Sequence, residues 1–398
     1  QTCALPILTI VATNMYSGIS KFLLLAIPFF VLSGNIMAKA GISRRLINFV
    51  NTCVGHRRGG IAIVCVIVAC FFGAISGSGP ATVAALGCVL IPAMIQQGGF
   101  SAPFSTALMA TASSIAIVIP PSIAFVVYAS ITGVSIADMF MGGIVPGILM
   151  GLALVIVVMI EARKNNIQAS MKKASGAERW AAFKDAFWGF LMPIIILGGI
   201  YGGVFTPTEA AAVAAVYSIV VSLFVYRELN FKGFINCVLK SAETTIQVMI
   251  LLAAASVFAF ILTSEGITVA IADAVLGVSS KKAVILLMMN IILLIGGMFM
   301  DGASLTTILG PLFLPIAQSA GIDIVHLGIV MVVNAAIGMF TPPFGLNLFV
   351  AASITKQPML KVAKGAMPFI LMSLIALLII TYVPEISLWL PHMIYGQW

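Results

Sequence analysis

The hydrophobic pattern of this chain occurs twice, in two interrupted apolar stretches. The first reads FFGAISGSGPATVAALG at 71–87 and ASSIAIVIPPSIAF at 112–125. The second reads IGGMFMDGASLTTILGPLFLP at 295–315 and NAAIGMFTPPFGLN at 334–347, and the two Pro-Pro pairs lie 222 positions apart. Each stretch breaks at small polar residues and again at Pro-Pro. Paired, interrupted hydrophobic segments in the two halves of a chain are typical of secondary transporters that bind substrate at the breaks.

The apolar runs and the basic loops together predict a polytopic all-α membrane protein. Runs of about 18 or more apolar residues recur, as bilayer-spanning helices require, and the alternating pattern of a transmembrane barrel is not seen. Basic loops stay on the cytoplasmic side, and they cluster at 44–58, 163–184, 227–240 and 356–364. These constraints predict spanning helices at 22–40, 139–160, 184–204, 208–226, 240–263 and 366–384, and an amphipathic surface helix at 42–56.

Two apolar regions must return to the side from which they start. Residues 60–96 and 281–319 are therefore predicted to be re-entrant helical hairpins, with tips at 76–80 and 301–304. Discontinuous helices that carry the Pro-Pro breaks follow each hairpin, at 103–130 and 325–355. The hairpins enter from opposite faces, so the structural repeat is inverted. Lys281 and Lys282 fall on the outer side, as a single exception to the charge rule.

The repeat also defines the organisation of the chain. The first inverted repeat covers 8–162, a cytoplasmic connector covers 163–183, and the second repeat covers 184–398. Residues 1–7, QTCALPI, are interpreted as a non-native leader, and a further helix is expected upstream of the chain.

The breaks are the expected sites of chemistry. Unwound backbone at membrane depth persists only where it is buried in protein or lines a polar cavity. Each break leaves carbonyls that can bind a cation and half-helix N-termini that can bind an anion, and Pro-Pro frees further carbonyls. Oxygen ligands suit Na⁺, a hard cation. The hydroxyls at the breaks are those of Ser76, Ser78, Ser113, Ser114, Ser122, Ser304 and Thr341.

Asp301 is the sharpest single candidate because it is an acid near a predicted hairpin tip within a membrane span. Its position also permits an N-cap of the following helix. Thr206 to Glu209 fit a helix start, with Thr206 as the N-cap and Pro207 at the first helical position. Asn334 and Asn347 flank the second Pro-Pro break, where an interhelical hydrogen bond and a ligand role are both open.

Composition excludes several other classes. Charged residues make up 8% of the chain and hydrophobic residues 61%, so the net charge of +8 is read as membrane orientation rather than nucleic-acid binding. The six cysteines form no CxxC pair, the three histidines form no HExxH, and no Walker A motif is present. An intramembrane enzyme would need a pair of catalytic groups at membrane depth, and only Asp301 lies there, so no enzyme is predicted.

The motifs SGSGPATVAALG, IPPSIAFVVYASITG, FTPTEAAA and TPPFGLNLFVAASI resemble the large membrane subunit of tripartite ATP-independent periplasmic (TRAP) transporters, over about 22–384. The resemblance implies a Na⁺-coupled importer of a small organic anion, such as a C4-dicarboxylate, sialic acid or another carboxylate, in the bacterial inner membrane. It implies an elevator mechanism, a small four-helix membrane subunit and a periplasmic substrate-binding protein as partners, and no cofactor besides the coupling ion Na⁺.

The resemblance also implies site residues. One Na⁺ site would involve Ser76, Ser78, Val118 and Pro120, and the other Gly302, Gly338 and Thr341; substrate would bind between Ser78, Ser122, Asp301 and Asn347. The chain departs from the family pattern at Gly79, where relatives commonly carry a second serine, and at Ala116, where a glycine is expected.

Two alternatives remain open from the sequence. One is an ion-coupled carboxylate transporter that acts without a binding protein. The other is a channel, which the closed hairpins of an inverted repeat disfavour, because such hairpins indicate alternating access.

Overall fold

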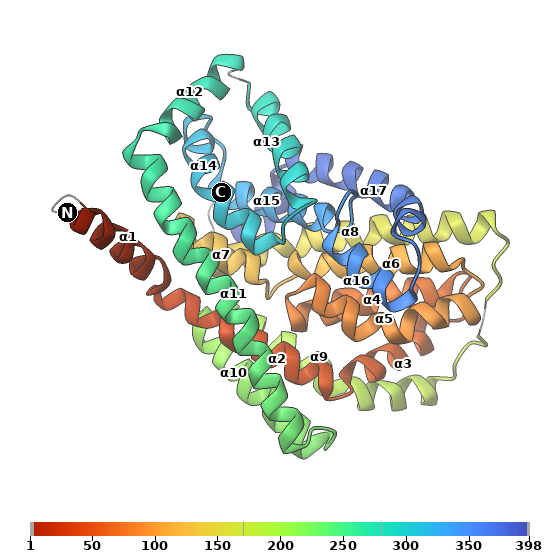
Figure 1. Cartoon of the computed structure of the whole chain (residues 1–398). Helices are drawn as coiled ribbons and strands as arrows, with labels where there is room; N and C mark the ends of the chain where they lie inside the picture. The colour runs from red at the N-terminus through yellow and green to blue at the C-terminus, as the bar shows by residue number, and fades with distance from the viewer. Residues whose placement is uncertain (1–3, 170, 280, 396–398) are drawn as a thin grey trace.

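The computed structural model describes residues 4–169, 171–279 and 281–395, and these residues form helices and loops without any strand (Figure 1). Short 3-10 segments at Phe22–Leu25 and Ile115–Ile117 and a π-helical segment at Val221–Val225 join the α-helices. The helices are α1 (Ala4–Ile19), α2 (Ala26–Lys39), α3 (Ile42–Val54), α4 (Gly60–Ser76), α5 (Gly79–Gln96), α6 (Ala102–Ser114), α7 (Ile123–Thr132), α8 (Ile136–Lys164), α9 (Gly176–Tyr201), α10 (Pro207–Val220), α11 (Phe231–Ser264), α12 (Ile267–Val278), α13 (Lys282–Gly297), α14 (Gly302–Ser319), α15 (Ile324–Gly338), α16 (Leu346–Thr355), α17 (Met359–Tyr382) and α18 (Glu385–Tyr395).

Both hairpins and both broken helices form as the sequence predicts, and the all-α membrane fold is confirmed. The first hairpin, α4–α5, turns at Gly77, whose φ of +60° ends α4 in the left-handed conformation that glycine tolerates. The second hairpin, α13–α14, turns at 298–301. The Pro-Pro pairs lie in the unwound segments between α6 and α7 and between α15 and α16. Seven helices of the described residues are long and apolar enough to cross a membrane.

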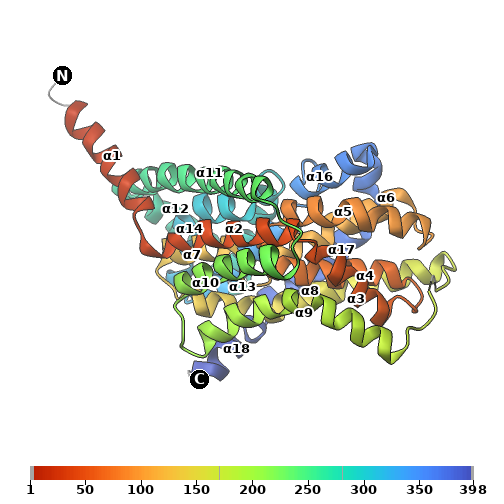
Figure 2. The same ribbon diagram turned by 90° about the horizontal axis from the view of Figure 1, so that it is seen from below.

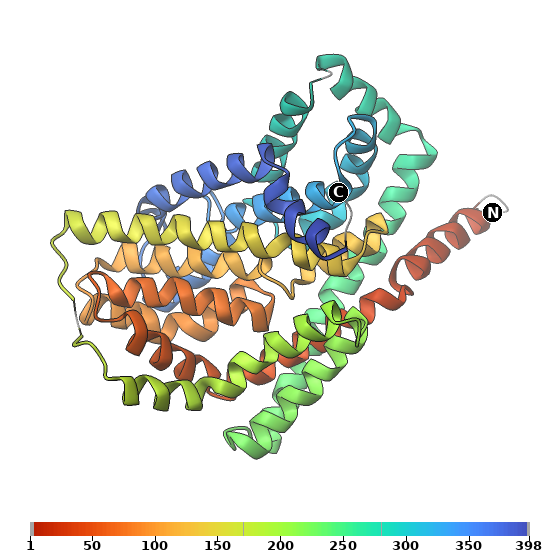
Figure 3. The ribbon, with the colours of Figure 1, turned by 180° about the vertical axis from the view of Figure 1, so that it is seen from behind.

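The two hairpins approach the centre of the molecule from opposite ends, and α11 runs beside α14 of the second hairpin (Figure 2). α5 packs on α6 and α16, whereas α14 packs on α7, α11 and α15, so each hairpin contacts a broken helix of the other repeat. On the opposite side, α8 extends along the body beside α17 and α18 (Figure 3). The hairpin tips therefore meet in the interior.

Close backbone contacts fix each hairpin against the broken helix of its own repeat. A Cβ on Gly338 would lie 2.2 Å from the carbonyl carbon of Gly297, so α15 and α13 touch backbone to backbone. In the first repeat, a Cβ on Gly73 would lie 2.6 Å from the Cα of Ala116. That contact has room for the single methyl of Ala116. This explains how the chain carries alanine at position 116, where the pattern of the family that it resembles predicts glycine.

The predicted surface helix forms as α3 and is attached by charge. Arg45 Nη2 lies 2.7 Å from Glu228 Oε1, and Arg45 Nε lies 3.1 Å from Asp185 Oδ1. The guanidinium also lies 3.9 Å from the centre of the Tyr226 ring, a cation–π contact. These contacts join α3 to the first half of α9 and to the segment before α11.

Several boundaries differ from the sequence expectations. α9 begins at Gly176, within the range assigned to a connector, and a capping box of Ser175 and Glu178 defines its start. The capping box predicted at Thr206 and Glu209 is confirmed, with the Glu209 carboxylate accepting the Thr206 N–H at 2.8 Å. Helices α1, α12 and α18 have no counterpart among the expected elements.

We expect Gly338→Ala to lower thermal stability because the added methyl overlaps the backbone of Gly297. Forcing extra volume into such a contact typically costs about 1–3 kcal/mol. Gly198→Ala is the matched control, since a Cβ on this helical glycine meets nothing within 4 Å and alanine is the better helix former by roughly 0.5–1 kcal/mol. The melting temperature of the purified protein in detergent is the measurement. A Gly338→Ala protein as stable as the Gly198→Ala control would contradict the backbone contact.

Candidate functional site

A cavity of about 600 Å³ lies between the two hairpin tips and α11, and we call it the central cavity. Both tips, the starts of α7 and α16, and one face of α11 line it. Its lining residues are Gly77, Ser78, Gly79, Pro80, Ala81, Ile117, Ile123, Ala124, Thr244, Gln247, Val248, Leu251, Phe299, Met300, Asp301, Gly302, Ala303, Ser304, Met339 and Leu346.

Four helix N-termini converge on the central cavity. α5 and α14 begin at Gly79 and Gly302, while α7 and α16 begin at Ile123 and Leu346, and all four starting residues belong to the lining. The first turn of a helix leaves backbone N–H groups unsatisfied and carries about half a positive charge. Among the described residues of the lining, Asp301 is the one charged side chain. The helix starts therefore contribute positive potential from the backbone, and no lysine or arginine is among the described residues that line this cavity.

Contacts between tips and breaks hold these N-termini together. Within each repeat, the hairpin tip contacts the Pro-Pro break of the same repeat. In the first repeat, a Cβ on Gly77 would lie 2.9 Å from the Pro121 carbonyl oxygen. In the second repeat, the Gly345 N–H donates to the Met298 carbonyl at 3.1 Å. The second helix of each hairpin contacts the break of the other repeat. A Cβ on Gly79 would lie 2.8 Å from Asn347 Nδ2, and one on Gly302 would lie 2.9 Å from Ile117 Cδ1.

The first tip presents a cluster of hydroxyl and carbonyl oxygens. Ser76 Oγ lies 2.8 Å from Thr82 Oγ1, and the Thr82 hydroxyl donates to the Ser78 carbonyl at 2.8 Å. Ser78 lies in the N-cap position of α5, but its hydroxyl makes no capping bond and lines the cavity. The Ser78 hydroxyl can therefore contact a ligand. Of the other residues expected at this Na⁺ site, Val118 has its carbonyl against Gly143 of α8, where a Cβ would lie 2.5 Å away.

Asp301 combines capping with exposure to the cavity. Its Oδ1 accepts the Ser304 N–H at 3.3 Å and also the Ser304 hydroxyl, so it is the N-cap of α14 that the sequence permits. Among the described residues, no side chain or N–H donates to its second oxygen, Oδ2. Because Asp301 lines the cavity, this oxygen is available to a cation or to a hydroxyl of a ligand.

The residues expected at the second Na⁺ site lie around the second break. Gly302 lines the cavity, and its carbonyl accepts the Thr306 hydroxyl at 2.9 Å. The Gly338 carbonyl accepts the Thr341 N–H at 2.9 Å, and the Thr341 hydroxyl donates to the Ile337 carbonyl at 2.6 Å. A hydroxyl that donates in this way keeps lone pairs for a cation. Gly338 and Thr341 lie outside the lining of the central cavity.

Two residues expected at the substrate are buried behind the cavity. Ser122 caps α7: its hydroxyl accepts the Phe125 N–H at 3.4 Å and donates to the Ile117 carbonyl at 2.5 Å. Asn347 is fully buried, and its Nδ2 donates to the Ala110 carbonyl at 3.2 Å. Neither residue lines the central cavity. Asn334 makes an interhelical bond from Nδ2 to Asn290 Oδ1 at 2.7 Å, in line with the interhelical alternative.

α11 contributes side chains to the central cavity that the motifs of the sequence do not indicate. Thr244 and Gln247 project into the central cavity from this helix, opposite the hairpin tips. The Gln247 amide has no hydrogen-bond partner among the described residues. Thr244 also lines a neighbouring cavity of about 410 Å³, which shares Ser78 with the central one and contains Lys39 and Lys240. Thr244 and Gln247 lie one turn apart in a stretch of polar residues, 240–247, that precedes the apolar part of this helix, and that polar stretch is the signal that could have identified this face.

Comparison with known proteins places the chain among transport proteins. Residues 2–386 match the family described as "Tripartite ATP-independent periplasmic transporter, DctM component". The C4-dicarboxylate TRAP transporter large permease protein of Pseudomonas aeruginosa is 46% identical over 381 residues, which are 96% of this chain and 89% of that protein. The sialic acid TRAP transporter large permease protein of Vibrio cholerae is 35% identical, over 97% of this chain and 90% of that protein.

Two further matches extend the comparison. The isethionate TRAP transporter permease protein of Oleidesulfovibrio alaskensis is 44% identical over 378 residues, which are 95% of this chain and 59% of that longer protein. The crystal structure of the YdaH transporter of Alcanivorax borkumensis is 16% identical with a TM-score of 0.67, over 98% of this chain and 89% of that one. At this identity the structural match supports the fold alone.

We expect Asp301→Asn to impair transport more than stability. Asparagine is nearly as good an N-cap, so capping alone predicts a loss of a few tenths to about 1 kcal/mol. Loss of a charged ligand oxygen costs about 1.5–3 kcal/mol. That cost corresponds to a Na⁺ concentration for half-maximal uptake that is roughly 10- to 150-fold higher. Asp323→Asn is the matched control, because Asp323 caps α15 through the His326 N–H at 2.9 Å and does not line the cavity. A Na⁺ dependence unchanged in Asp301→Asn would exclude the carboxylate from ion and substrate binding.

A second pair of variants tests α11. Thr244 and Thr245 both donate to the carbonyl four residues earlier, at 3.1 and 2.7 Å, but only Thr244 lines the central cavity. Thr244→Val should raise the KM for uptake by about 2- to 10-fold, the value of one hydrogen bond. Thr245→Val should leave the KM unchanged. Equal KM values in the two variants would remove this face of α11 from the substrate site.

Proposed function

Since the chain belongs to the family of tripartite ATP-independent periplasmic transporters, as its DctM component, we propose that it imports a small organic anion by coupling to Na⁺. It is a multi-pass protein of the bacterial inner membrane, and a transporter permease rather than an enzyme. The observation that carries the proposal is the convergence of four helix N-termini on one cavity between the hairpin tips. Such N-termini bind carboxylates and other anions.

The electrostatics of this cavity support the proposed coupling to Na⁺. The Asp301 carboxylate and an anionic substrate would repel each other in a site that is partly shielded from water. A cation at each tip offsets that repulsion, and the oxygens of Ser76, Ser78, Gly302 and Thr341 are suitable ligands. Substrate affinity then depends on Na⁺, and Na⁺ affinity depends on substrate by the same factor.

The assignment of substrate and partners is also part of the proposal. The relatives are named for C4-dicarboxylate, isethionate and sialic acid, all of them small organic anions. We infer a carboxylate or a related anion, delivered by a periplasmic binding protein, and a small membrane subunit that packs on the exposed apolar helices. In the proposed elevator-type cycle, the two hairpins, α4–α5 and α13–α14, move together with the broken helices against α2 and α11.

Uptake by proteoliposomes tests this proposal. The chain would be reconstituted with its small subunit and binding protein, and radiolabelled C4-dicarboxylate, isethionate and sialic acid would be offered with Na⁺ or with K⁺. We expect saturable uptake of one of these anions that requires Na⁺ outside and all three components. Uptake at the same rate in K⁺ would contradict the coupling. Full uptake by the chain alone would replace the tripartite assignment with a transporter that acts without a binding protein.

A further inference from the structure

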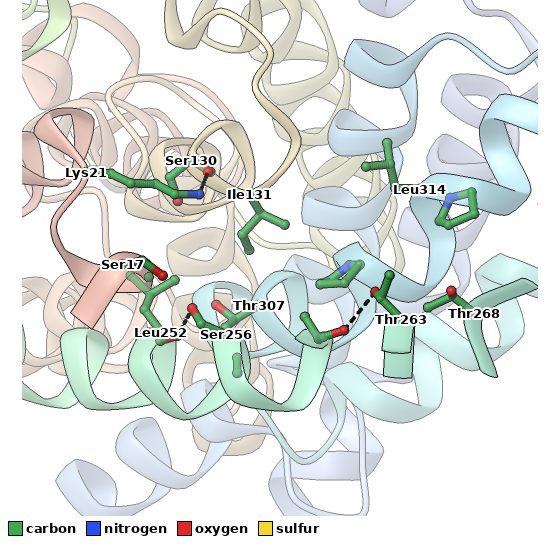
Figure 4. Close-up of a pocket in the computed structure, with 15 residues that line it drawn as sticks. Ser17, Lys21, Ser130, Ile131, Leu252, Ser256, Thr263, Thr268, Thr307 and Leu314 are labelled. Carbon is green, nitrogen blue, oxygen red and sulfur yellow. Dashed lines mark hydrogen bonds between the residues drawn. The ribbon is translucent and has the colours of Figure 1, made fainter. Parts of the chain in front are cut away.

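A second cavity of about 490 Å³ lies beside the central cavity, and we call it the Lys21 pocket (Figure 4). It is bounded by α1, α7, α11, α12 and α14. Ser304 lines the central cavity and Thr307 lines this one, so α14 passes directly from one to the other. Its lining residues are Ser17, Gly18, Lys21, Ser130, Ile131, Leu252, Ala255, Ser256, Ala259, Thr263, Thr268, Thr307, Pro311, Leu314 and Pro315.

One face of α11 connects this pocket with both cavities described above. The residues of α11 that line the three cavities recur every three or four positions, which is the spacing of a single helical face. From Cys237 to Thr263 the face extends about 39 Å at 1.5 Å per residue, more than the roughly 30 Å of a bilayer core. The residues along it are Cys237, Lys240 and Thr244, then Gln247, Val248 and Leu251, then Leu252, Ala255, Ser256, Ala259 and Thr263.

The sequence assigns the Lys21 pocket to the extracytoplasmic end of this face. Lys21 precedes the membrane span that contains α2, whereas Lys39 ends that span and the basic cluster that begins at Arg44 follows it. Basic clusters stay on the cytoplasmic side. A ligand that moves inward along α11 would therefore meet Lys21 first, the central cavity second, and Lys39 with Lys240 last.

The side chains of the pocket define the chemistry of its ligand. Among the described residues that line it, Lys21 is the one charged group. Its ammonium donates to the Ser130 carbonyl at 2.5 Å, which leaves two N–H donors for an anion. Five of the six hydroxyls donate to carbonyls of their own helices and present lone pairs: Ser17, Ser130, Ser256, Thr263 and Thr307.

We propose that the Lys21 pocket is a second ligand site on the transport path, which binds a carboxylate that also carries hydroxyl groups. The carboxylate accepts from Lys21, and the hydroxyl groups of the ligand donate to the serine and threonine oxygens. This proposal rests on the proposed function, because it makes the pocket a station on the route to the central cavity.

A structural role for Lys21 makes a different prediction. Ser130 lies in the last turn of α7, where carbonyls carry partial negative charge and a lysine is stabilising. If capping α7 were the whole role of Lys21, its replacement would change stability without changing any response to ligand. The test must therefore measure ligand occupancy of the pocket.

Protection of an introduced cysteine supplies that measurement. In a chain whose six native cysteines are replaced by alanine, Ala259→Cys places a thiol on the wall of the Lys21 pocket without removing a hydroxyl, and Leu251→Cys places one in the central cavity. A membrane-impermeant thiol reagent is applied from outside to proteoliposomes, with malate or succinate as the probe. These two dicarboxylates differ by one hydroxyl group.

We expect malate to protect Ala259→Cys from modification at a concentration about three- to tenfold lower than the concentration of succinate that protects it equally. This ratio corresponds to the free energy of one additional hydrogen bond. Adding Lys21→Gln should raise the half-protecting malate concentration by about two- to fivefold, as for an exposed ion pair, while Lys21→Arg should preserve protection. Lys282→Gln is the matched control, since Lys282 also donates to a backbone carbonyl, that of Gly321 at 2.7 Å, and does not line the pocket.

The outcomes separate this proposal from the proposed function. Protection of Leu251→Cys without protection of Ala259→Cys would overturn the second site and leave the central site intact. Equal protection of Ala259→Cys with and without Lys21 would overturn the role of the lysine. Failure of both thiols to respond, together with absent Na⁺-dependent uptake, would reject the proposed function itself.

As a measurement independent of the introduced cysteines, Lys21→Gln in the native-cysteine chain should raise the KM for malate uptake and leave the melting temperature near that of Lys282→Gln. A KM unchanged from that of Lys282→Gln would contradict the proposal.

Discussion

The structure depends on one constraint: backbone groups freed at membrane depth must find partners inside the protein. Two hairpins and two Pro-Pro breaks each expose such groups, and the fold brings all four to the same place. The tip of each hairpin contacts the break of its own repeat at Gly77 or Gly345, and the break of the other repeat at Gly79 or Gly302. The four helix starts then surround one cavity, where backbone N–H groups face a ligand and no described lining residue is a lysine or arginine.

Glycine makes this convergence possible because the contacts are between backbones. The Gly297–Gly338 approach and its counterpart at Gly73 and Ala116 bring each broken helix onto its hairpin. Asn347 illustrates the same crowding, since its amide occupies the space beside Gly79 that a serine side chain would need. The departure of this chain from the family pattern at position 79 is thus matched by a neighbour that packs against the glycine.

Local signals predicted most of the fold, and long-range packing decided the rest. The hairpins, the breaks and the N-cap role of Asp301 follow from Gly, Pro and Asp at fixed positions, and the resemblance to the transporter family is confirmed. The sequence could not place Ser122 and Asn347, because each binds nearby backbone behind the cavity rather than facing it. Thr244 and Gln247 were missed because α11 meets the tips only in three dimensions. Helix α12 was missed because its short apolar run lies beside a longer one.

The central claim is that an anion binds at the converging helix starts with Na⁺ beside it. The most direct measurement is an electron cryo-microscopy map of the chain with its small subunit, in saturating Na⁺ and transported anion. The account predicts density for the anion within hydrogen-bonding distance of the first-turn N–H groups of α5 and α14, and ion density at the tips that disappears in K⁺. Anion density held by a lysine or arginine, with the space between Ser78 and Asp301 unchanged by substrate, would contradict it.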